Sequence, residues 1–117
     1  MIRAGHIELF VEDPLASRDF YEKVLGATVA DVQNGEFVWL ALGGMVLLLR
    51  PGSARPPIPT YQEAPCGLVL YTDDLEETRQ ELVGRGLEFR GTDGSDHCLT
   101  FTDPDGNWFQ LVDPGDH

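Results

Sequence analysis

The stretch Thr102–Val112, TDPDGNWFQLV, joins a tight turn to a strand, and the rest of the chain can be interpreted from it. Its DPDG segment (103–106) predicts a type I β-turn, because Asp is favoured at the first position, Pro sets φ at the second and Gly suits the last. The following residues alternate as in a strand. If Phe109 and Leu111 point into a core, the opposite face carries Trp108, Gln110 and Val112.

The first half of the chain has the pattern of one strand, one helix and three strands. Alternation predicts strands over 5–12, 28–32, 36–42 and 45–50. Asp13 and Pro14 are typical of a helix start, and the helix is expected to bury Leu15, Phe20, Val24 and Leu25 before Gly26 ends it. Asn34-Gly35 and Gly43-Gly44 each predict a two-residue hairpin turn. This half is therefore βαβββ.

The second half repeats this order. A strand is expected over 67–72, a helix after Asp74, and strands over 87–90, 97–102 and 107–112. A shift of 61 residues places HIELFVED (6–13) over GLVLYTDD (67–74). Such a repeat accounts for strands, helices and turns together, so it favours an internal duplication.

The chain length fits one domain over 1–117, composed of module one (1–50), a linker (51–65) and module two (66–117). The linker contains five prolines, at 51, 56, 57, 59 and 65, and is expected to be a loop over or beside a pocket and the most mobile internal segment. The two cysteines, Cys66 and Cys98, are expected to be reduced thiols without a role beyond packing.

The net charge of −12, with only eight basic residues, argues against nucleic-acid and anionic-membrane partners. No apolar run reaches membrane-spanning length and no export signal is visible, so a cytoplasmic protein is expected. The sequence also lacks a nucleophile elbow, a P-loop and a dinucleotide-binding glycine motif. No catalytic residue can be named from it.

Two long segments resemble the vicinal oxygen chelate superfamily, which includes glyoxalases, extradiol dioxygenases and bleomycin-resistance proteins. They are HIELFVEDPLASRDFYEKVLGATV (6–29) and FTDPDGNWFQLV (101–112). The resemblance implies an α+β fold of two tandem βαβββ modules whose sheets curl around a cavity, and it implies a homodimer. It does not identify an activity, because this fold carries many chemistries.

Metal-dependent members of that superfamily place ligands on the first and last strand of each module. Carried onto this chain, these positions are His6, Leu48, Gly67 and Gln110. Leu48 and Gly67 have no side-chain donor, whereas a catalytic divalent ion generally needs about three protein ligands. The resemblance therefore implies no metal cofactor, with one divalent ion held by His6, Glu8 and Gln110 as the alternative.

Strand alternation around such a cavity predicts an aromatic lining with few polar groups, as is usual for a small-molecule site. Glu8 is expected either to pair with a group such as Arg50 or to meet a cationic ligand in a water-filled cavity. The candidate ligand-binding residues are His6, Glu8, Phe10, Phe37, Trp39, Leu48, Arg50, Tyr71, Trp108 and Gln110.

Three functions remain open at this point. The first is a metal-independent protein, similar to the bleomycin-resistance proteins, that sequesters an aromatic or cationic, antibiotic-like molecule. The second is a divalent-metal-dependent lyase, isomerase or dioxygenase of the same superfamily. The third is a regulatory or accessory module without a ligand of consequence. The incomplete metal-ligand set favours the binding protein over the enzyme.

Overall fold

The computed structural model describes residues 1–116 and divides into two compact units, Met1–Arg55 and Pro56–His117. The boundary between the units falls inside the predicted linker. The prediction of an α+β chain of two βαβββ-like modules is confirmed, and the modules form two mixed sheets. The two units are described separately below.

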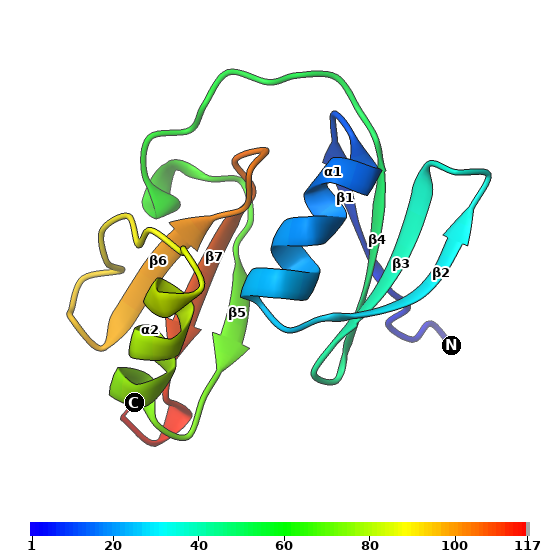
Figure 1. Cartoon of the computed structure of the whole chain (residues 1–117). Coiled ribbons are helices and arrows are strands. Elements are labelled where there is room, and N and C mark those ends of the chain that lie inside the picture. The colour runs from blue at the N-terminus through cyan, green and yellow to red at the C-terminus, as the bar shows by residue number, and fades with distance from the viewer. Residues whose placement is uncertain (117) are drawn as a thin grey trace. The chain divides into compact units, whose positions relative to one another are not determined.

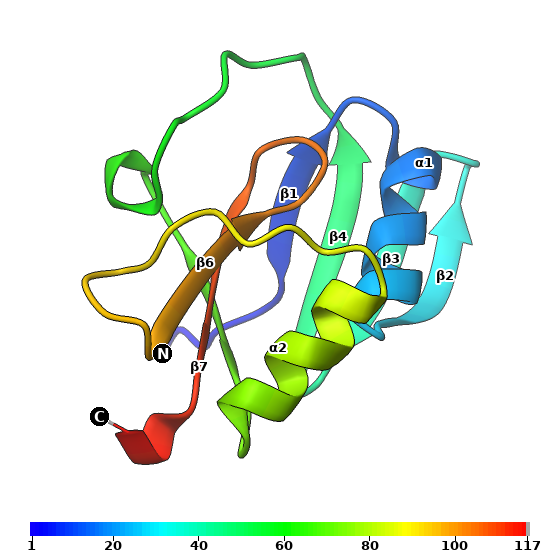
Figure 2. The same ribbon diagram turned by 60° about the vertical axis from the view of Figure 1, so that its left-hand side comes forward.

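The first unit contains a four-stranded sheet in the order β1-β4-β3-β2, whose strands lie side by side in Figure 2. The strands are β1 (Ile7–Val11), β2 (Thr28–Gln33), β3 (Phe37–Leu42) and β4 (Met45–Pro51). β1 is parallel to β4, and the other pairs are antiparallel. The predicted two-residue turn at Gly43-Gly44 forms, since Leu42 pairs with Met45. The first hairpin has a three-residue connection instead, because Gln33 pairs with Phe37, although Asn34 and Gly35 take the positive φ values of 53° and 68° that a primed turn requires.

Helix α1 (Pro14–Asp19) lies against β3 and β4 of this sheet (Figure 1). The Asp13 carboxylate caps it by accepting hydrogen bonds from the backbone N–H groups of Leu15 and Ala16, at 3.1 and 3.3 Å. The helix continues as a π-helical turn, η1 (Phe20–Val24), whose wider spacing changes which side chains face inward. The predicted apolar stripe is only partly buried: Leu15 is exposed, and Phe20, Val24 and Leu25 are half-buried. The fully buried residues are Pro14, Ser17 and Tyr21.

The core of the first unit lies on the α1 side of the sheet. Its strand residues all have 5% exposure or less, and they are Leu9, Val11, Val38, Leu40, Leu47 and Leu49. Leu49 of β4 pairs in register with Leu9 of β1 on one side and with Val38 of β3 on the other. Leu47 of β4 pairs with Leu40 of β3. Because side chains alternate, the residues between them point to the other face of the sheet.

The second unit contains a three-stranded sheet in the order β5-β7-β6. Its strands are β5 (Leu68–Tyr71), β6 (Cys98–Thr102) and β7 (Trp108–Val112), and its helix α2 spans Leu75–Gly84 after the capping residue Asp74. Two short 3-10 turns, η2 (Tyr61–Glu63) and η3 (Pro114–Asp116), complete it. In the core, the rings of Phe101 and Phe109 are stacked with centroids 5.2 Å apart.

The predicted strand over 87–90 is wrong. Residues 87–91 pass beside β6, where the Arg90 N–H donates to the Thr100 carbonyl at 2.7 Å and the Thr100 N–H donates to the Gly91 carbonyl at 3.3 Å. Only an isolated bridge between Thr92 and Leu99 follows. Gly91 and Gly94 have φ values of 75° and 90°, and these left-handed residues turn the chain before a ladder can develop.

The DPDG turn forms as predicted. The Gly106 N–H donates to the Asp103 carbonyl at 3.1 Å, and Gly106 has φ 86°. The buried Asp103 carboxylate accepts hydrogen bonds from the backbone N–H groups of Asp105 and Asn107 and from the Asn107 amide, at 2.8 to 2.9 Å. These bonds satisfy a buried charge and fix where β7 begins.

Within residues 1–116, the helices are all too short or too polar to cross a bilayer.

Candidate functional site

The face of the first sheet opposite α1 carries most of the candidate ligand-binding residues of the first unit. Register places Glu8, Leu48 and Trp39 side by side across β1, β4 and β3, and it places Phe10 beside Arg50 in the next row. We call this surface the aromatic face. It comprises Glu8, Phe10, Asp31, Gln33, Phe37, Trp39, Leu48 and Arg50, with His6 immediately before β1.

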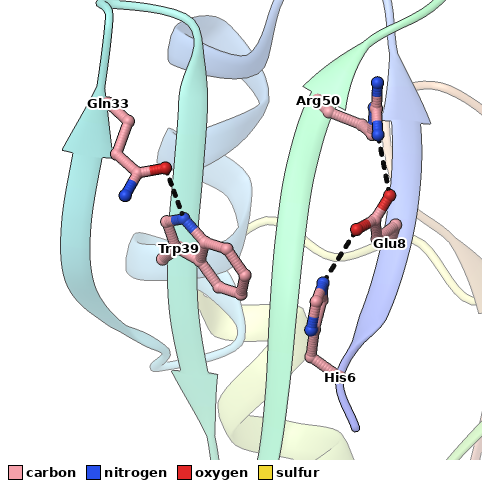
Figure 3. A network of polar contacts seen from close by, with 5 residues as sticks. All are labelled: His6, Glu8, Gln33, Trp39 and Arg50. Atoms are coloured by element: carbon pink, nitrogen blue, oxygen red, sulfur yellow. Dashed lines mark hydrogen bonds and ion pairs between the residues drawn. The ribbon is translucent and has the colours of Figure 1, made fainter.

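Three of these side chains form a continuous network of polar contacts, shown in Figure 3. Arg50 Nη1 donates to Glu8 Oε1 at 2.9 Å, and His6 Nε2 lies 2.8 Å from Glu8 Oε2. The hydrogen bond from Arg50, followed by the contact with His6, lowers the pKa of the Glu8 carboxyl below its ordinary value of 4.5. Glu8 therefore has an internal partner for each oxygen, which is the first of the two environments expected for it.

Arg50 also contacts the aromatic rings of this face. Its guanidinium carbon lies 5.0 Å from the ring centroid of Phe10 and 5.7 Å from that of Phe37. Both distances are in the range of cation–π attraction. The Arg50 Nε atom is buried and, among residues 1–116, has no hydrogen-bond partner. Glu8 and the two rings thus hold the guanidinium in one orientation.

Trp39 is fixed in the same manner at two points. Its Nε1–H donates to Gln33 Oε1 at 3.0 Å, and its ring meets the His6 ring edge-on with centroids 4.6 Å apart (Figure 3). The Trp39 side chain remains half-buried. A half-exposed indole whose orientation is already fixed can stack on a planar ligand with little loss of rotamer entropy.

Gln33 and Asp31 were missed by the sequence analysis. Val29 pairs with Leu40 on the core side, yet Asp31 pairs with Trp39 and Gln33 with Phe37, because the register shifts between Val29 and Asp31. The extra residue, Ala30, is a β-bulge that moves the rest of β2 to the opposite phase. Plain alternation would have placed Asp31 on the same face as Val29. The sequence signal for this change of face is weak: within 31–33 the polar residues Asp31 and Gln33 alternate with the apolar Val32.

Of the four positions that bind a metal in related enzymes, His6 and Gln110 carry a ligand atom here and Leu48 and Gly67 do not, whereas a catalytic divalent ion generally needs about three protein ligands. His6 contacts Glu8, and Leu48 is 5% exposed without a donor atom. Gly67 has no side chain, and a Cβ built there would collide with the ring of Tyr61. Gln110 Nε2 donates to Asp93 Oδ2 at 3.2 Å. Residues 1–116 contain no cluster of three or more His, Cys, Asp or Glu side chains suited to a metal.

In the second unit, Trp108 and Gln110 lie on one face of β7, as predicted, but both are buried, at 2% and 8% exposure. The Trp108 Nε1–H donates to the Ile58 carbonyl at 3.0 Å. Tyr71, at the end of β5, is 72% exposed and pairs in register with Val112. Trp108 and Gln110 are therefore covered by their own chain, whereas Tyr71 is open.

A cavity of about 400 Å³ lies elsewhere in the second unit, at the start of α2. Its lining is dominated by carboxylates, with Arg79 and His97 among them. His97 lies 3.6 Å from Asp96 and 3.5 Å from Asp116. Acidic residues are favourable near a helix N-terminus, so the lining has a structural explanation and we assign it no ligand.

Comparison with known proteins gives a consistent result. The model of the Glyoxalase/Bleomycin resistance protein/Dioxygenase superfamily matches residues 3–111. No curated protein matches the chain.

Three similar solved structures illustrate the range of functions on this fold. They are the fosfomycin resistance protein FosX from Listeria monocytogenes complexed with Mn(II) and sulfate (18% identity, 97% of this chain and 91% of that one, TM-score 0.76), a bleomycin-binding protein complexed with bleomycin (18%, 96% and 98%, 0.71), and lactoylglutathione lyase from Agrobacterium tumefaciens (19%, 95% and 93%, 0.70). At these identities the likeness establishes the fold alone.

Proposed function

Because the chain belongs to the Glyoxalase/Bleomycin resistance protein/Dioxygenase superfamily, we propose that it binds a small aromatic cation on the aromatic face, without a metal, and acts by sequestering it. The observation that carries this proposal is that Trp39 has a fixed orientation and lies opposite the exposed carboxylate of Asp31. The proposal covers antibiotic-like molecules, since one structural relative is complexed with bleomycin.

The aromatic content of the face supports binding by stacking. Phe10 is 45% exposed, and Phe37 and Trp39 are half-buried, so three rings are presented by β1 and β3. Several polar groups around them are already engaged: Gln33 Oε1 accepts the indole N–H, and Glu8 Oε1 accepts a hydrogen bond from Arg50 Nη1. A ligand ring can therefore contact the aromatic side chains without leaving these polar groups unsatisfied.

The charge of the ligand follows from the carboxylates on the face. Glu8 is neutralised by Arg50 and contacts His6, so it is a poor point of attraction for a further cation. Asp31 is exposed and lies directly opposite Trp39 in the β2–β3 ladder. A planar cation stacked on Trp39 would bring its positive charge next to Asp31, and the net charge of −12 favours its approach.

The metal-free character of the proposal rests on donor chemistry. On the first sheet, His6 and Glu8 are bound to each other, and the position between Glu8 and Trp39 is occupied by the aliphatic Leu48. In the second unit Gly67 has no side chain, and the Gln110 Nε2 donates to Asp93 Oδ2, which leaves the amide oxygen of Gln110 as the one side-chain ligand atom of that pair. A metal-dependent lyase, isomerase or dioxygenase would have to hold its ion with His6, Glu8 and Gln110, the alternative set.

The proposal is tested with two probes, metal-free bleomycin and thioflavin T, each titrated against the full chain by calorimetry. Asp31→Asn is expected to weaken binding of both probes about five- to tenfold, as loss of one charge-assisted contact does. Asp73→Asn, which removes an exposed carboxylate from the second unit, is the matched control and should leave affinity unchanged. Equal losses in both variants, or no binding of either probe, would count against the proposal.

A further inference from the structure

A second aromatic surface in the molecule is covered by a segment of its own chain. The segment Ile58–Gln62, which we call the strap, lies on the β7 face that carries Trp108. The Ile58 carbonyl accepts the Trp108 Nε1–H at 3.0 Å, and the Tyr61 ring meets the indole edge-on at a centroid separation of 6.4 Å with an interplanar angle of 83°. The strap thus satisfies the polar atom of Trp108 and covers its ring.

Gly67 makes room for the strap. A Cβ at this position would overlap the ring and hydroxyl of Tyr61, so any other residue would displace it. Gly67 immediately precedes β5, where Leu68 pairs with Phe109, the residue after Trp108. The Tyr61 ring therefore fills the space that a side chain at residue 67 would occupy.

The strap is also tied to Gln110, the other polar residue of this face. Gln62 Nε2 donates to the Thr92 carbonyl and to Asp93 Oδ1, both at 3.0 Å. The second carboxylate oxygen of Asp93 accepts the Gln110 amide at 3.2 Å. Asp93 consequently bridges the strap to the sheet, and the Gln110 amide is engaged by the chain itself.

We propose that the strap is a displaceable intramolecular occupant of an aromatic binding site on Trp108, with Tyr61 in the place of a ligand ring. The strap is held by the Ile58 carbonyl, by the Tyr61 ring against Trp108 and Gly67, and by the Gln62 amide, and no strand ladder includes residues 58–62. Pro56, Pro57 and Pro59 lack the N–H groups that such a ladder needs. The site takes a neutral aromatic molecule about the size of phenol. When the strap leaves, the phenol ring of Tyr61 leaves the space between the Trp108 indole and Gly67, and neither of these residues carries a charge. This site belongs to the second unit, whereas the aromatic face belongs to the first, and it goes beyond the function proposed for that face.

The experiment uses the full chain carrying Trp39→Phe, in which Trp108 is the only tryptophan, and p-cresol, which reproduces the Tyr61 side chain. Tyr61→Ala is expected to make Trp108 accessible to acrylamide quenching, and p-cresol is expected to restore protection and raise Tm. The Tyr61→Ala chain should bind p-cresol about tenfold more tightly than the parent does, or more, because the competing Tyr61 ring has been removed. Tyr61→Phe keeps the ring and should behave as the parent.

Gln62→Ala provides a second route, since it retains the ring and releases the strap from Thr92 and Asp93. It is expected to raise quenching of Trp108 and to strengthen p-cresol binding by a smaller factor than Tyr61→Ala. If p-cresol binds neither variant better than the parent, or if Trp108 stays protected in a folded Tyr61→Ala chain, the strap is a fixed part of the core and the proposal is wrong.

Discussion

Arg50 Nη1 reaches Glu8 Oε1 at 2.9 Å across the parallel strands β4 and β1, although the register partner of Glu8 is Leu48 and that of Arg50 is Phe10. The contact is thus a diagonal between neighbouring rows. It lets one guanidinium pair with a carboxylate and still lie over the rings of Phe10 and Phe37. The charges of this face are therefore balanced within the face.

The Glu8 network predicts a specific dependence of stability on pH. The pKa of Glu8 is lowered, chiefly by Arg50 and then by His6. A carboxyl with a depressed pKa in the folded state adds stability above its unfolded pKa, and this contribution is lost as pH falls through the folded value. Glu8→Gln should therefore be less stable than the parent at neutral pH, and the difference should disappear in acid below the ordinary value of 4.5. Urea unfolding across a pH series measures it; a difference that persists in acid contradicts the network.

The two tryptophans are expected to respond differently to truncation. Trp108 is 2% exposed, so Trp108→Ala should destabilise the chain by about 3–5 kcal/mol, the range for removal of a large buried ring. Trp39 is half-buried, and Trp39→Ala should chiefly weaken binding of an aromatic probe, by about 1 kcal/mol. Chemical unfolding and thioflavin T titration of both variants separate the two roles. A larger stability loss at Trp39 than at Trp108 would reverse the assignment.

Gly67 and Tyr61 are expected to be energetically coupled. Gly67→Ala should cost about 1–3 kcal/mol of unfolding free energy, because the new methyl group meets the Tyr61 ring. In a Tyr61→Ala background the same change should cost much less, and the non-additivity measures the contact. Gly5→Ala is the control, since nothing lies within 4 Å of a Cβ at that position. Additive effects of the two substitutions would show that the ring and the glycine do not share this space.

The metal prediction concerns purified protein. We expect well under one equivalent of Zn, Ni, Fe, Co or Mn, and we expect chelator to leave Tm unchanged, because a ligand stabilises the native state only when it binds. His6→Ala should then have only local consequences for Glu8 and Trp39. Elemental analysis checks this; a stoichiometric metal lost on replacement of His6 or Gln110 would favour the enzyme instead.

Self-association is predicted from the sheet edges. The first sheet ends in β1 and β2, and the second ends in β5 and in β6, of which β6 is partly covered by its hydrogen bonds to Arg90 and Gly91. Uncovered strand edges promote pairing with another chain, and closed symmetric dimers are the commonest result. We expect a homodimer in sedimentation velocity at micromolar concentration. A monomer over that range is the contrary result.

The sequence predicted the parts of the molecule where strands are regular. Phe10, Phe37 and Arg50 were assigned to one face because β1, β3 and β4 keep strict alternation through their hairpins. The bulge at Ala30 and the π-helical turn of η1 each alter the local period. The alternating polar residues Asp31 and Gln33 are a weak signal of the first change, and the residue types give no signal of the second. Alternation was therefore reliable only where the period stayed constant.

Contacts between distant segments were beyond such reasoning. The position of Tyr61 above Gly67 depends on how a proline-rich segment folds back, and no periodic pattern describes that path. Burial of Trp108 follows from the same packing. Alternation predicted which face of β7 carries Trp108, but it could not predict that Ile58 and Tyr61 cover the indole. The mobility predicted for residues 51–65 stays a prediction, and hydrogen exchange can measure it.

The bulge in β2 also bears on how this chain can vary in length over evolution. Val29 and Asp31 pair with the adjacent residues Leu40 and Trp39, so Ala30 occupies no rung of the ladder. A lineage that lost Ala30 would gain a regular strand with the same side chains on each surface. Loss of Val32 instead would reverse the inward and outward assignment of its neighbours. A sequence alignment of relatives should therefore place a one-residue gap in β2 at Ala30, because a gap placed at another position of the strand would misalign the residue that pairs with Trp39.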